Sequence, residues 1–284
     1  LIIQKPGSSS LYYIFTTDDN AGVDGFRYSE VDMTLNGGLG DVTVTKNILL
    51  HTPTSEKLTA IKHCNNQDIW VVTHGVSSSV FRSFLVTSAG VNATPVISTV
   101  GIAEGNFGGG QFKASPDGKK LAALYRTIDR HELYDFNANT GIVSNPLLFS
   151  QTTAHTGVYG VEFSPDGTKL YISTKYQGNI YQYDLLASTT AAIINSRIMV
   201  TSNLSSYGGG LQLGPDNKIY FSKINSNSVG VINNPNTLGL GCNYVDNGVY
   251  LAGATCSWGL PTFSRYIFNP PPPLFTDVQT ACGS

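Results

Sequence analysis

The chain has 284 residues, of which 41% are hydrophobic and 13% are charged, and its net charge is −2. This length suits one large domain or two ordinary ones, and the apolar share is sufficient for a core. The low net charge without a basic run excludes nucleic acid or an anionic membrane surface as the main partner. No apolar run is long enough for a membrane-spanning helix.

Strand and turn signals alternate from the start of the chain. Ile2–Gly7 ends in a Pro-Gly turn and is followed by strand-like runs at Leu11–Thr16 and Phe26–Met33. A looser version of the same unit occupies Leu58–Trp70. β-Branched and aromatic residues bounded by Gly, Pro, Asn and Asp are typical of short strands joined by tight turns. This part of the chain therefore predicts sheet structure with very little helix.

An acidic loop separates the first two strand-like runs that follow the opening turn. It carries Asp18, Asp19 and Asp24. Calcium requires several carboxylate oxygens on one compact loop, so these aspartates are candidate calcium ligands. Their spacing is not that of an EF-hand, and the alternative is an acidic loop that is simply solvated. We expect no other metal and no cofactor.

The middle of the chain contains the clearest repeat. Ser-Pro-Asp-Gly at 115–118 and at 164–167, and Gly-Pro-Asp-Asn at 214–217, each separate two strand-like runs. The first apolar residue after each turn recurs every 49 residues, at Leu121, Leu170 and Ile219. A repeat of strand units with this period predicts an all-β fold, a β-propeller with four-stranded blades.

The repeats predict five blades that are substantially present and the start of a sixth. They are centred near Leu11, Ile69, Leu121, Leu170 and Ile219, and the sixth starts at Trp258. The propeller domain is predicted over residues 1–268. A proline linker over 269–273 follows, because four consecutive prolines cannot pair in a sheet and favour an extended spacer. The alternative is that the prolines cap the last blade. Residues 274–284 are predicted to begin an immunoglobulin-like or PKD-type module.

No local catalytic motif is present: the sequence contains no nucleophile elbow, zinc-protease helix, paired Cys-x-x-Cys or phosphate-binding loop. This absence predicts that the chain is not an enzyme. One polar register could line the central channel, because the first strand of each blade faces it. Its candidate binding residues are Lys62, Lys113, Glu162, Gln212 and Thr262. They could bind an ion or a sugar, or be solvated or paired with one another.

Two cysteines flank a predicted strand pair near the end of the repeats. Cys242 and Cys256 could form a disulfide in an exported protein, but sequence does not fix the geometry that a disulfide requires. Both the bonded and the free state therefore remain open.

Four further runs of the chain are informative: residues 6–16, Arg27–Val42, Glu56–His63 and Gly259–Phe263. Together they resemble a family of Bacteroidetes surface proteins, and the resemblance covers nearly all of residues 1–268. Members of the family are similar to long multidomain proteins in which immunoglobulin-like or PKD-type modules follow the propeller. They end in a type IX secretion sorting domain of the gliding-motility-associated class.

The resemblance implies export and display on the bacterial cell surface. The absence of local catalytic motifs favours a non-catalytic role in adhesion, scaffolding or binding, with other domains of the same polypeptide, surface proteins or glycans as partners. The alternative is a propeller hydrolase or lyase with a metal or polar site on the axis. The family also has a further N-terminal segment, so we expect about seven blades in the intact protein and a gap in this chain alone.

Overall fold

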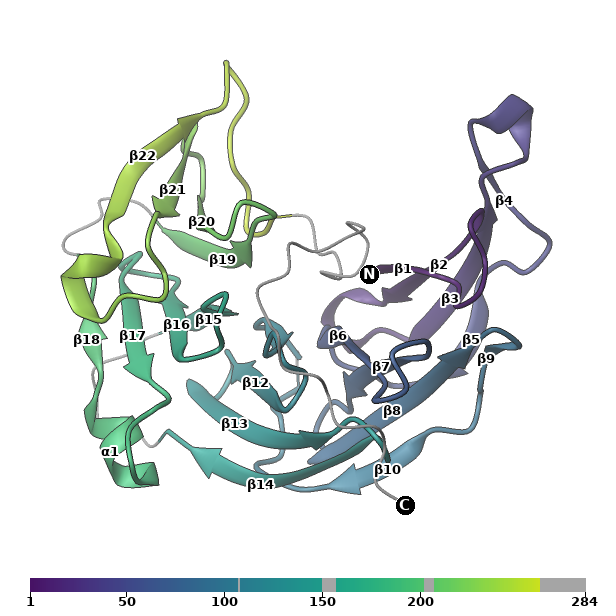
Figure 1. The fold of residues 1–284 in the computed structure, drawn as a ribbon, viewed down its shortest axis with the longest axis horizontal. Helices are drawn as coiled ribbons and strands as arrows, with labels where there is room; N and C mark the ends of the chain where they lie inside the picture. Colours follow the sequence, from purple (N-terminus) through teal and green to yellow (C-terminus); the bar gives the residue numbers. More distant parts are fainter. Residues whose placement is uncertain (107, 150–156, 202–206, 261–284) are drawn as a thin grey trace. The chain divides into compact units, whose positions relative to one another are not determined.

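The computed structural model describes residues 1–106, 108–149, 157–201 and 207–260. Antiparallel strands dominate these residues (Figure 1). Helical structure in the described part is limited to α1 (Thr190–Asn195) and three 3-10 helices, η1 (Asp19–Ala21), η2 (Asn36–Gly38) and η3 (Gly239–Cys242). The expectation of very little helix is confirmed.

The first two sheets each have five strands. The first consists of β1 (Ile2–Gln4), β2 (Leu11–Thr17), β3 (Phe26–Asp32), β4 (Asp41–Val42) and β5 (Ile48–His51). The second consists of β6 (Leu58–Lys62), β7 (Ile69–His74), β8 (Val80–Thr87), β9 (Gly90–Val91) and β10 (Val96–Thr99). In each sheet two short strands pair with different halves of the third long strand, so together they fill the fourth position.

The remaining three sheets are four-stranded, with their strands in chain order. They are β11 (Phe112–Ala114), β12 (Lys120–Tyr125), β13 (Arg130–Asn137) and β14 (Ile142–Leu148); β15 (Val158–Phe163), β16 (Lys169–Thr174), β17 (Ile180–Asp184) and β18 (Ile198–Met199); and β19 (Gly208–Leu213), β20 (Ile219–Lys223), β21 (Ser228–Ile232) and β22 (Tyr244–Tyr250). The five predicted repeats are therefore five successive antiparallel meanders.

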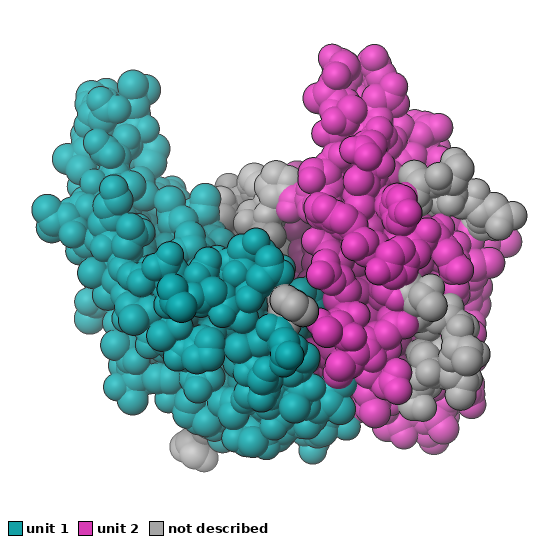
Figure 2. Space-filling model, turned by 180° about the vertical axis from the view of Figure 1, so that it is seen from behind, with its two compact units in different colours: residues 1–109, 134–146, 262–284 teal, residues 110–133, 147–261 magenta. Residues whose placement is uncertain are grey.

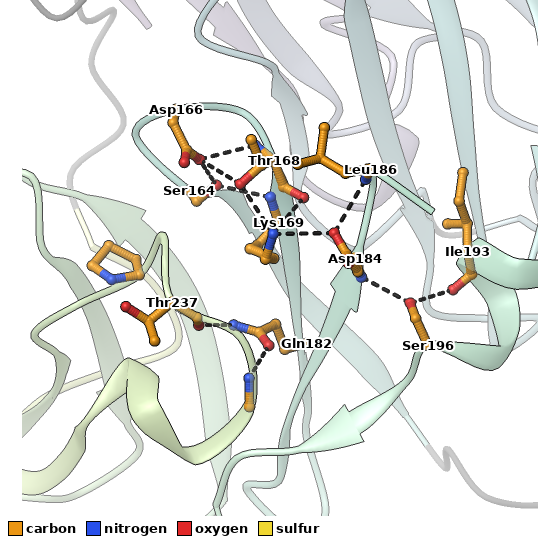
Figure 3. A network of polar contacts seen from close by, with 12 residues as sticks. Ser164, Asp166, Thr168, Lys169, Gln182, Asp184, Leu186, Ile193, Ser196 and Thr237 are labelled. Atoms are coloured by element: carbon orange, nitrogen blue, oxygen red, sulfur yellow. Dashed lines mark hydrogen bonds and ion pairs between the residues drawn. The ribbon is translucent and has the colours of Figure 1, made fainter. Parts of the chain in front are cut away.

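The Ser-Pro-Asp-Gly turn owes its shape to one carboxylate (Figure 3). Asp166 Oδ1 accepts hydrogen bonds from Ser164 Oγ at 2.6 Å, from Thr168 N at 3.0 Å and from Thr168 Oγ1 at 2.8 Å. Ser164 Oγ in turn accepts the amide of Lys169 at 2.8 Å, and Lys169 Nζ reaches Asp184 Oδ1 at 3.0 Å. Polar side chains that bond to nearby backbone groups favour turns in this way.

The preceding repeat uses the same arrangement. Asp117 Oδ1 accepts from Ser115 Oγ at 2.6 Å and from Lys119 N at 3.1 Å, and Ser115 Oγ accepts from Lys120 N at 2.9 Å. The recurrence shows that the repeated sequence motif encodes the turn between the first and second strands of a sheet.

The described residues fall into two compact units (Figure 2). Unit 1 contains residues 1–109 and 134–146, and unit 2 contains residues 110–133 and 147–260. Unit 1 has an apolar cluster that joins the first sheet to the second, with Phe15, Phe26 and Phe84 buried in it.

Unit 2 has two such clusters, one on each face of the fourth sheet. On one face Phe163 and Ile172 pack with Leu124 of the third sheet. On the other, Tyr171 packs with Leu211 of the fifth sheet. Because successive residues of a strand point to opposite faces, β16 buries a side chain on both sides. Each fully buried large apolar side chain contributes about 1.5–3 kcal/mol.

A segment beyond β22 lies beside the fifth sheet, where the sixth repeat was predicted to start. Gly210 N donates to Trp258 O at 2.7 Å, just as Gln111 N donates to Tyr159 O at 2.8 Å between the third and fourth sheets. Trp258 thus contacts the fifth sheet in the same way that Tyr159 contacts the third sheet. The proline linker at 269–273, the module at 274–284 and the strand at Phe263 lie outside the described residues, so the gap expected in the ring of this chain stays a prediction.

We predict that Asp166→Ala lowers the free energy of unfolding by about 1–3 kcal/mol, since three hydrogen bonds to one carboxylate are lost. Urea unfolding would measure it. Asp41→Ala is the matched control, because Asp41 is exposed and its Oδ1 accepts only the Val42 amide among the described residues; we expect a change within about 0.5 kcal/mol there. Equal effects of the two changes would contradict the role assigned to the turn.

Candidate functional site

Three of the predicted first-strand residues meet in unit 2. Lys113 of β11 donates from Nζ to Gln212 Oε1 of β19 at 2.6 Å and forms an ion pair with Glu162 Oε2 of β15 at 3.2 Å. Their exposed fractions are 8%, 6% and 5%, respectively. The first strands of three successive sheets therefore bring one cation, one amide and one carboxylate together, as the register predicted.

The backbone completes the hydrogen bonding of this trio. Glu162 accepts the amides of Phe163 at 3.1 Å and Leu213 at 3.0 Å, and Gln212 Nε2 donates to Leu213 O at 3.0 Å. Every charge in the trio has a partner inside it. Of the two alternatives for this register, mutual pairing describes these three residues.

Sequence reasoning missed Gln111, which lies two residues before Lys113. Its Oε1 accepts the amide of Val161 at 3.0 Å and that of Leu211 at 2.9 Å, so one side chain ties β15 to β19. The contact needs space beside it: a Cβ added to Gly210 would lie 2.5 Å from Gln111 Nε2. The alternation of polar residues along the first strand was the available signal.

The other two members of the predicted register are not part of this trio. Lys62 is one residue out of register, because Ile61 occupies the equivalent place: Ile61 pairs with Trp70 as Lys113 pairs with Ala122. Successive strand residues face opposite sides, so a slip of one residue turns the side chain away. The assignment of Lys62 is therefore wrong. Thr262 lies outside the described residues.

The disulfide between Cys242 and Cys256 that the sequence left open is not formed. Cys242 and Cys256 are both free thiols. Asn234, beyond one end of β21, donates its amide to Cys242 O, whereas Cys256 donates its own to Ser226 O beyond the other end. At about 3.3 Å per strand residue the two cysteines are separated by roughly 15 Å or more, beyond the reach of a disulfide. Cys64 is disulfide-bonded.

The aspartates of the acidic loop interact with nearby groups of the protein. Asp18 Oδ2 accepts the amide of Asp24 at 2.9 Å, and Asp24 Oδ1 pairs with Arg27 Nη2 at 3.2 Å. Asp19 is the first residue of η1, and Asn20 donates its amide to Glu56 Oε1 at 3.3 Å. These interactions do not gather the three aspartates. Within the described ranges, no group of three or more His, Cys, Asp or Glu residues could hold a metal ion.

A second charged cluster is buried in unit 1 and was not predicted. Lys57, which is 0% exposed, contacts Glu104 and donates to Gly108 O at 3.2 Å and Gly109 O at 3.4 Å. Glu104 Oε2 also lies 3.2 Å from His74 Nδ1. The cluster joins Glu104, Gly108 and Gly109 to Lys57 and to His74 of β7. Its charged groups are almost completely buried, so they face one another rather than solvent.

Burial and charge set the protonation of this cluster in opposite ways. Burial lowers the pKa of His74, and Lys57 adds to this effect while Glu104 opposes it. Burial alone would raise the pKa of Glu104, but the hydrogen bond with His74 and the charge of Lys57 hold it below its ordinary value. A carboxylate beside a buried cation is therefore the stable form.

The part of the chain that the structure describes contains no helix with the length and apolar character of a membrane span. No family model and no curated protein matches the chain. Solved structures do match.

A proposed 6-phosphogluconolactonase from Bacteroides fragilis is 16% identical with a TM-score of 0.54, covering 84% of this chain and 67% of that one. The periplasmic gluconolactonase of Pseudomonas aeruginosa is 12% identical with a TM-score of 0.51, covering 80% and 66%. A protein from Lactobacillus plantarum is 15% identical with a TM-score of 0.50, covering 78% and 63%. The chain spans about two thirds of the length of these structures. At these identities the likeness shows the fold alone, and this chain has a β-propeller fold.

The prediction that the chain is not an enzyme is contradicted by this comparison. The first two of these structures are a proposed lactonase and a lactonase, and lactonases are enzymes. The prediction rested on the absence of local catalytic motifs. A propeller can assemble a site from residues of separate repeats, so the absence of a local motif does not exclude catalysis.

We predict that Lys113→Met lowers the free energy of unfolding by about 3 kcal/mol, because it leaves a buried carboxylate without its cation. Adding Glu162→Gln should recover part of this loss, with a coupling of about 1–3 kcal/mol in a double-mutant cycle followed by urea unfolding. Lys119→Met, at an exposed lysine of the neighbouring turn, is the control and should change little. Additive single changes at 113 and 162 would refute the pairing.

We also predict that acid destabilises unit 1. Burial, with the charge of Arg82, lowers the pKa of His51 to about 4 from 6.5. The unfolded chain therefore takes up this proton near pH 6.5 and the folded chain near pH 4, so stability falls as pH drops through that window. The lowered pKa of His74 acts in the same direction. Thermal melts between pH 7 and pH 5 should show a smaller loss in His51→Gln than in the parent, and parallel losses would be incompatible with this assignment.

Proposed function

We propose that this chain is a propeller module of a long, exported cell-surface protein of Bacteroidetes, and that it binds a surface protein or a glycan. Type IX secretion and a gliding-motility-associated sorting domain belong to the same proposal, with immunoglobulin-like or PKD-type modules downstream. The runs Arg27–Val42 and Glu56–His63 support it, because they resemble that family. The low share of charged residues, 13%, suits an exported surface.

The single observation that carries the proposal of export is the state of the cysteines. Cys64 is disulfide-bonded, while Cys242 and Cys256 are free. Disulfides persist in oxidising compartments and are rare in the cytosol. A protein with a structural disulfide is therefore expected outside the cytoplasm.

Binding would use the turns rather than the first strands. The charges of Lys113 and Glu162 are taken up by each other, so they offer little to a ligand. Large apolar side chains are exposed at several turns instead, among them Leu39 at 79% and Tyr176 at 58%. Exposed apolar groups of this kind are typical of interaction surfaces when they gather in patches.

The test isolates the full-length protein from its own cells. An antibody against the chain should label intact cells. Peptide mapping of the denatured protein should find Cys242 and Cys256 alkylated without reduction and Cys64 alkylated only after reduction. In the matched variant Cys256→Ser, Cys64 should still react only after reduction. Labelling only after lysis, with Cys64 alkylated before reduction, would overturn the proposal.

Lactone hydrolysis is a second candidate function, favoured by the likeness to two lactonase structures. Opening a lactone needs a group that activates water. Release of acid from gluconolactone faster than its spontaneous hydrolysis would support this function, and a rate equal to the spontaneous one would exclude it for this substrate.

A further inference from the structure

An aromatic cluster surrounds one lysine on the exposed end of unit 2. Lys175 and Tyr176 lie in the turn between β16 and β17, Tyr207 directly precedes β19, Tyr159 belongs to β15, and Trp258 follows β22. We call these five residues the aromatic–lysine cluster. Four segments far apart in the sequence contribute to it, so no single run of the sequence points to it.

The rings contact one another and the ammonium group. Lys175 Nζ lies 4.3 Å from the ring centroid of Trp258 and 5.3 Å from that of Tyr176. Tyr176 meets Tyr207 edge to face at 6.3 Å, and Trp258 meets Tyr159 at 5.4 Å. Tyr176 is 58% exposed and Tyr207 is 53% exposed. The cluster therefore presents ring surface to solvent.

The backbone holds the cluster in place. Lys175 N donates to Gly157 O at 2.6 Å, and Gly208 N donates to Lys175 O at 2.8 Å. Gly157 has a φ of +77°, and a Cβ there would lie 2.8 Å from the ring of Tyr176. The tyrosine thus rests on a position that only glycine allows. Because the rings are already held in place, little conformational entropy is lost when a ligand binds to them.

The neighbouring turn carries two further cations. This turn, between β12 and β13 of the preceding sheet, is flanked in the sequence by Arg126 and Arg130. This turn is joined to the start of β15, because Asp129 Oδ1 accepts the amides of Gly157 at 2.9 Å and Val158 at 3.0 Å. None of Lys175, Arg126 and Arg130 forms an ion pair with a described residue, whereas Asp129 is occupied by these two amides. This charge distribution favours an anion.

We propose that the aromatic–lysine cluster binds an acidic saccharide, a sugar chain that carries carboxylate or sulfate groups. The proposal deepens the binding role suggested above and rests on it. Exposed aromatic faces are electron-rich and attract the C–H face of a pyranose ring, while the unpaired cations attract its acid groups. Gln177 and Asn179 lie in the same turn as Lys175, where Asn179 Nδ2 donates to Gln177 Oε1 at 3.1 Å.

The test measures binding of the propeller-bearing full-length protein to short oligomers of galacturonic acid, to a sulfated chondroitin oligosaccharide and to a neutral xylo-oligosaccharide, by calorimetry. We expect one of the two acidic probes to bind, and the neutral one to bind at least about tenfold more weakly. Which acidic probe binds identifies the acid group. Tyr176→Ala and Tyr207→Ala should each weaken that binding about tenfold, and Lys175→Gln should reduce its dependence on salt.

Matched variants distinguish the loss of the binding site from a loss of folding. Tyr250→Ala removes a tyrosine that is 66% exposed on β22, and Lys119→Gln removes an exposed lysine of a turn at the other end of a sheet; neither should change binding. Thermal melts confirm folding of every variant. Three results would overturn the proposal: no binding of either acidic probe, equal binding of the neutral one, or binding indifferent to Tyr176 and Tyr207. Cell labelling and thiol counts stay unaffected by these outcomes, so the proposed surface role is judged separately.

Discussion

The sheets of this chain are apolar on both faces, and the rest of the structure depends on covering them. All six residues of β16 are buried, although a strand of an isolated sheet would leave half of its side chains in water. In unit 2 the fourth sheet has one cluster with Phe163 and Leu124 and another with Tyr171 and Leu211. Neither face could be exposed without losing several large buried side chains, so each meander is stable only in the company of its neighbours.

Face-to-face packing forces the first strands close together, and this sets the chemistry of their side chains. Ser173 Oγ donates to Gly209 O at 2.7 Å, and Ser222 Oγ to Trp258 O at 3.1 Å, one repeat later. Polar atoms in so confined a place must find partners within the protein. The pairing of Lys113 with Glu162 follows from the same demand: it neutralises two charges that the packing has removed from water.

The fold could be predicted from the sequence because its signals are local and repeated. Ser164 and Asp166 encode a turn by contacts within a few residues, and the recurrence of Leu121, Leu170 and Ile219 gives the period directly. The candidate site could be predicted only in part from the sequence. Lys113, Glu162 and Gln212 follow from a shared register, but the slip at Lys62 depends on how β6 pairs with β7. The cluster of Lys57 and Glu104 depends on contacts with Gly108 and Gly109 that no repeated motif announces. The aromatic–lysine cluster joins residues that only the packing of sheets brings together.

The side chain of Gln111 has a consequence for how such a chain can arise. It occupies a space shared by three sheets, accepting amides from Val161 and Leu211, and Gly210 provides the room. A polypeptide made of identical copies of one repeat would place several glutamines, or none, in that space. The first would collide and the second would leave two amides unsatisfied. If the repeats arose by duplication of one unit, divergence at this position had to follow, and a designed concatemer of one repeat from this chain would need the same broken symmetry at Gln111 and Gly210.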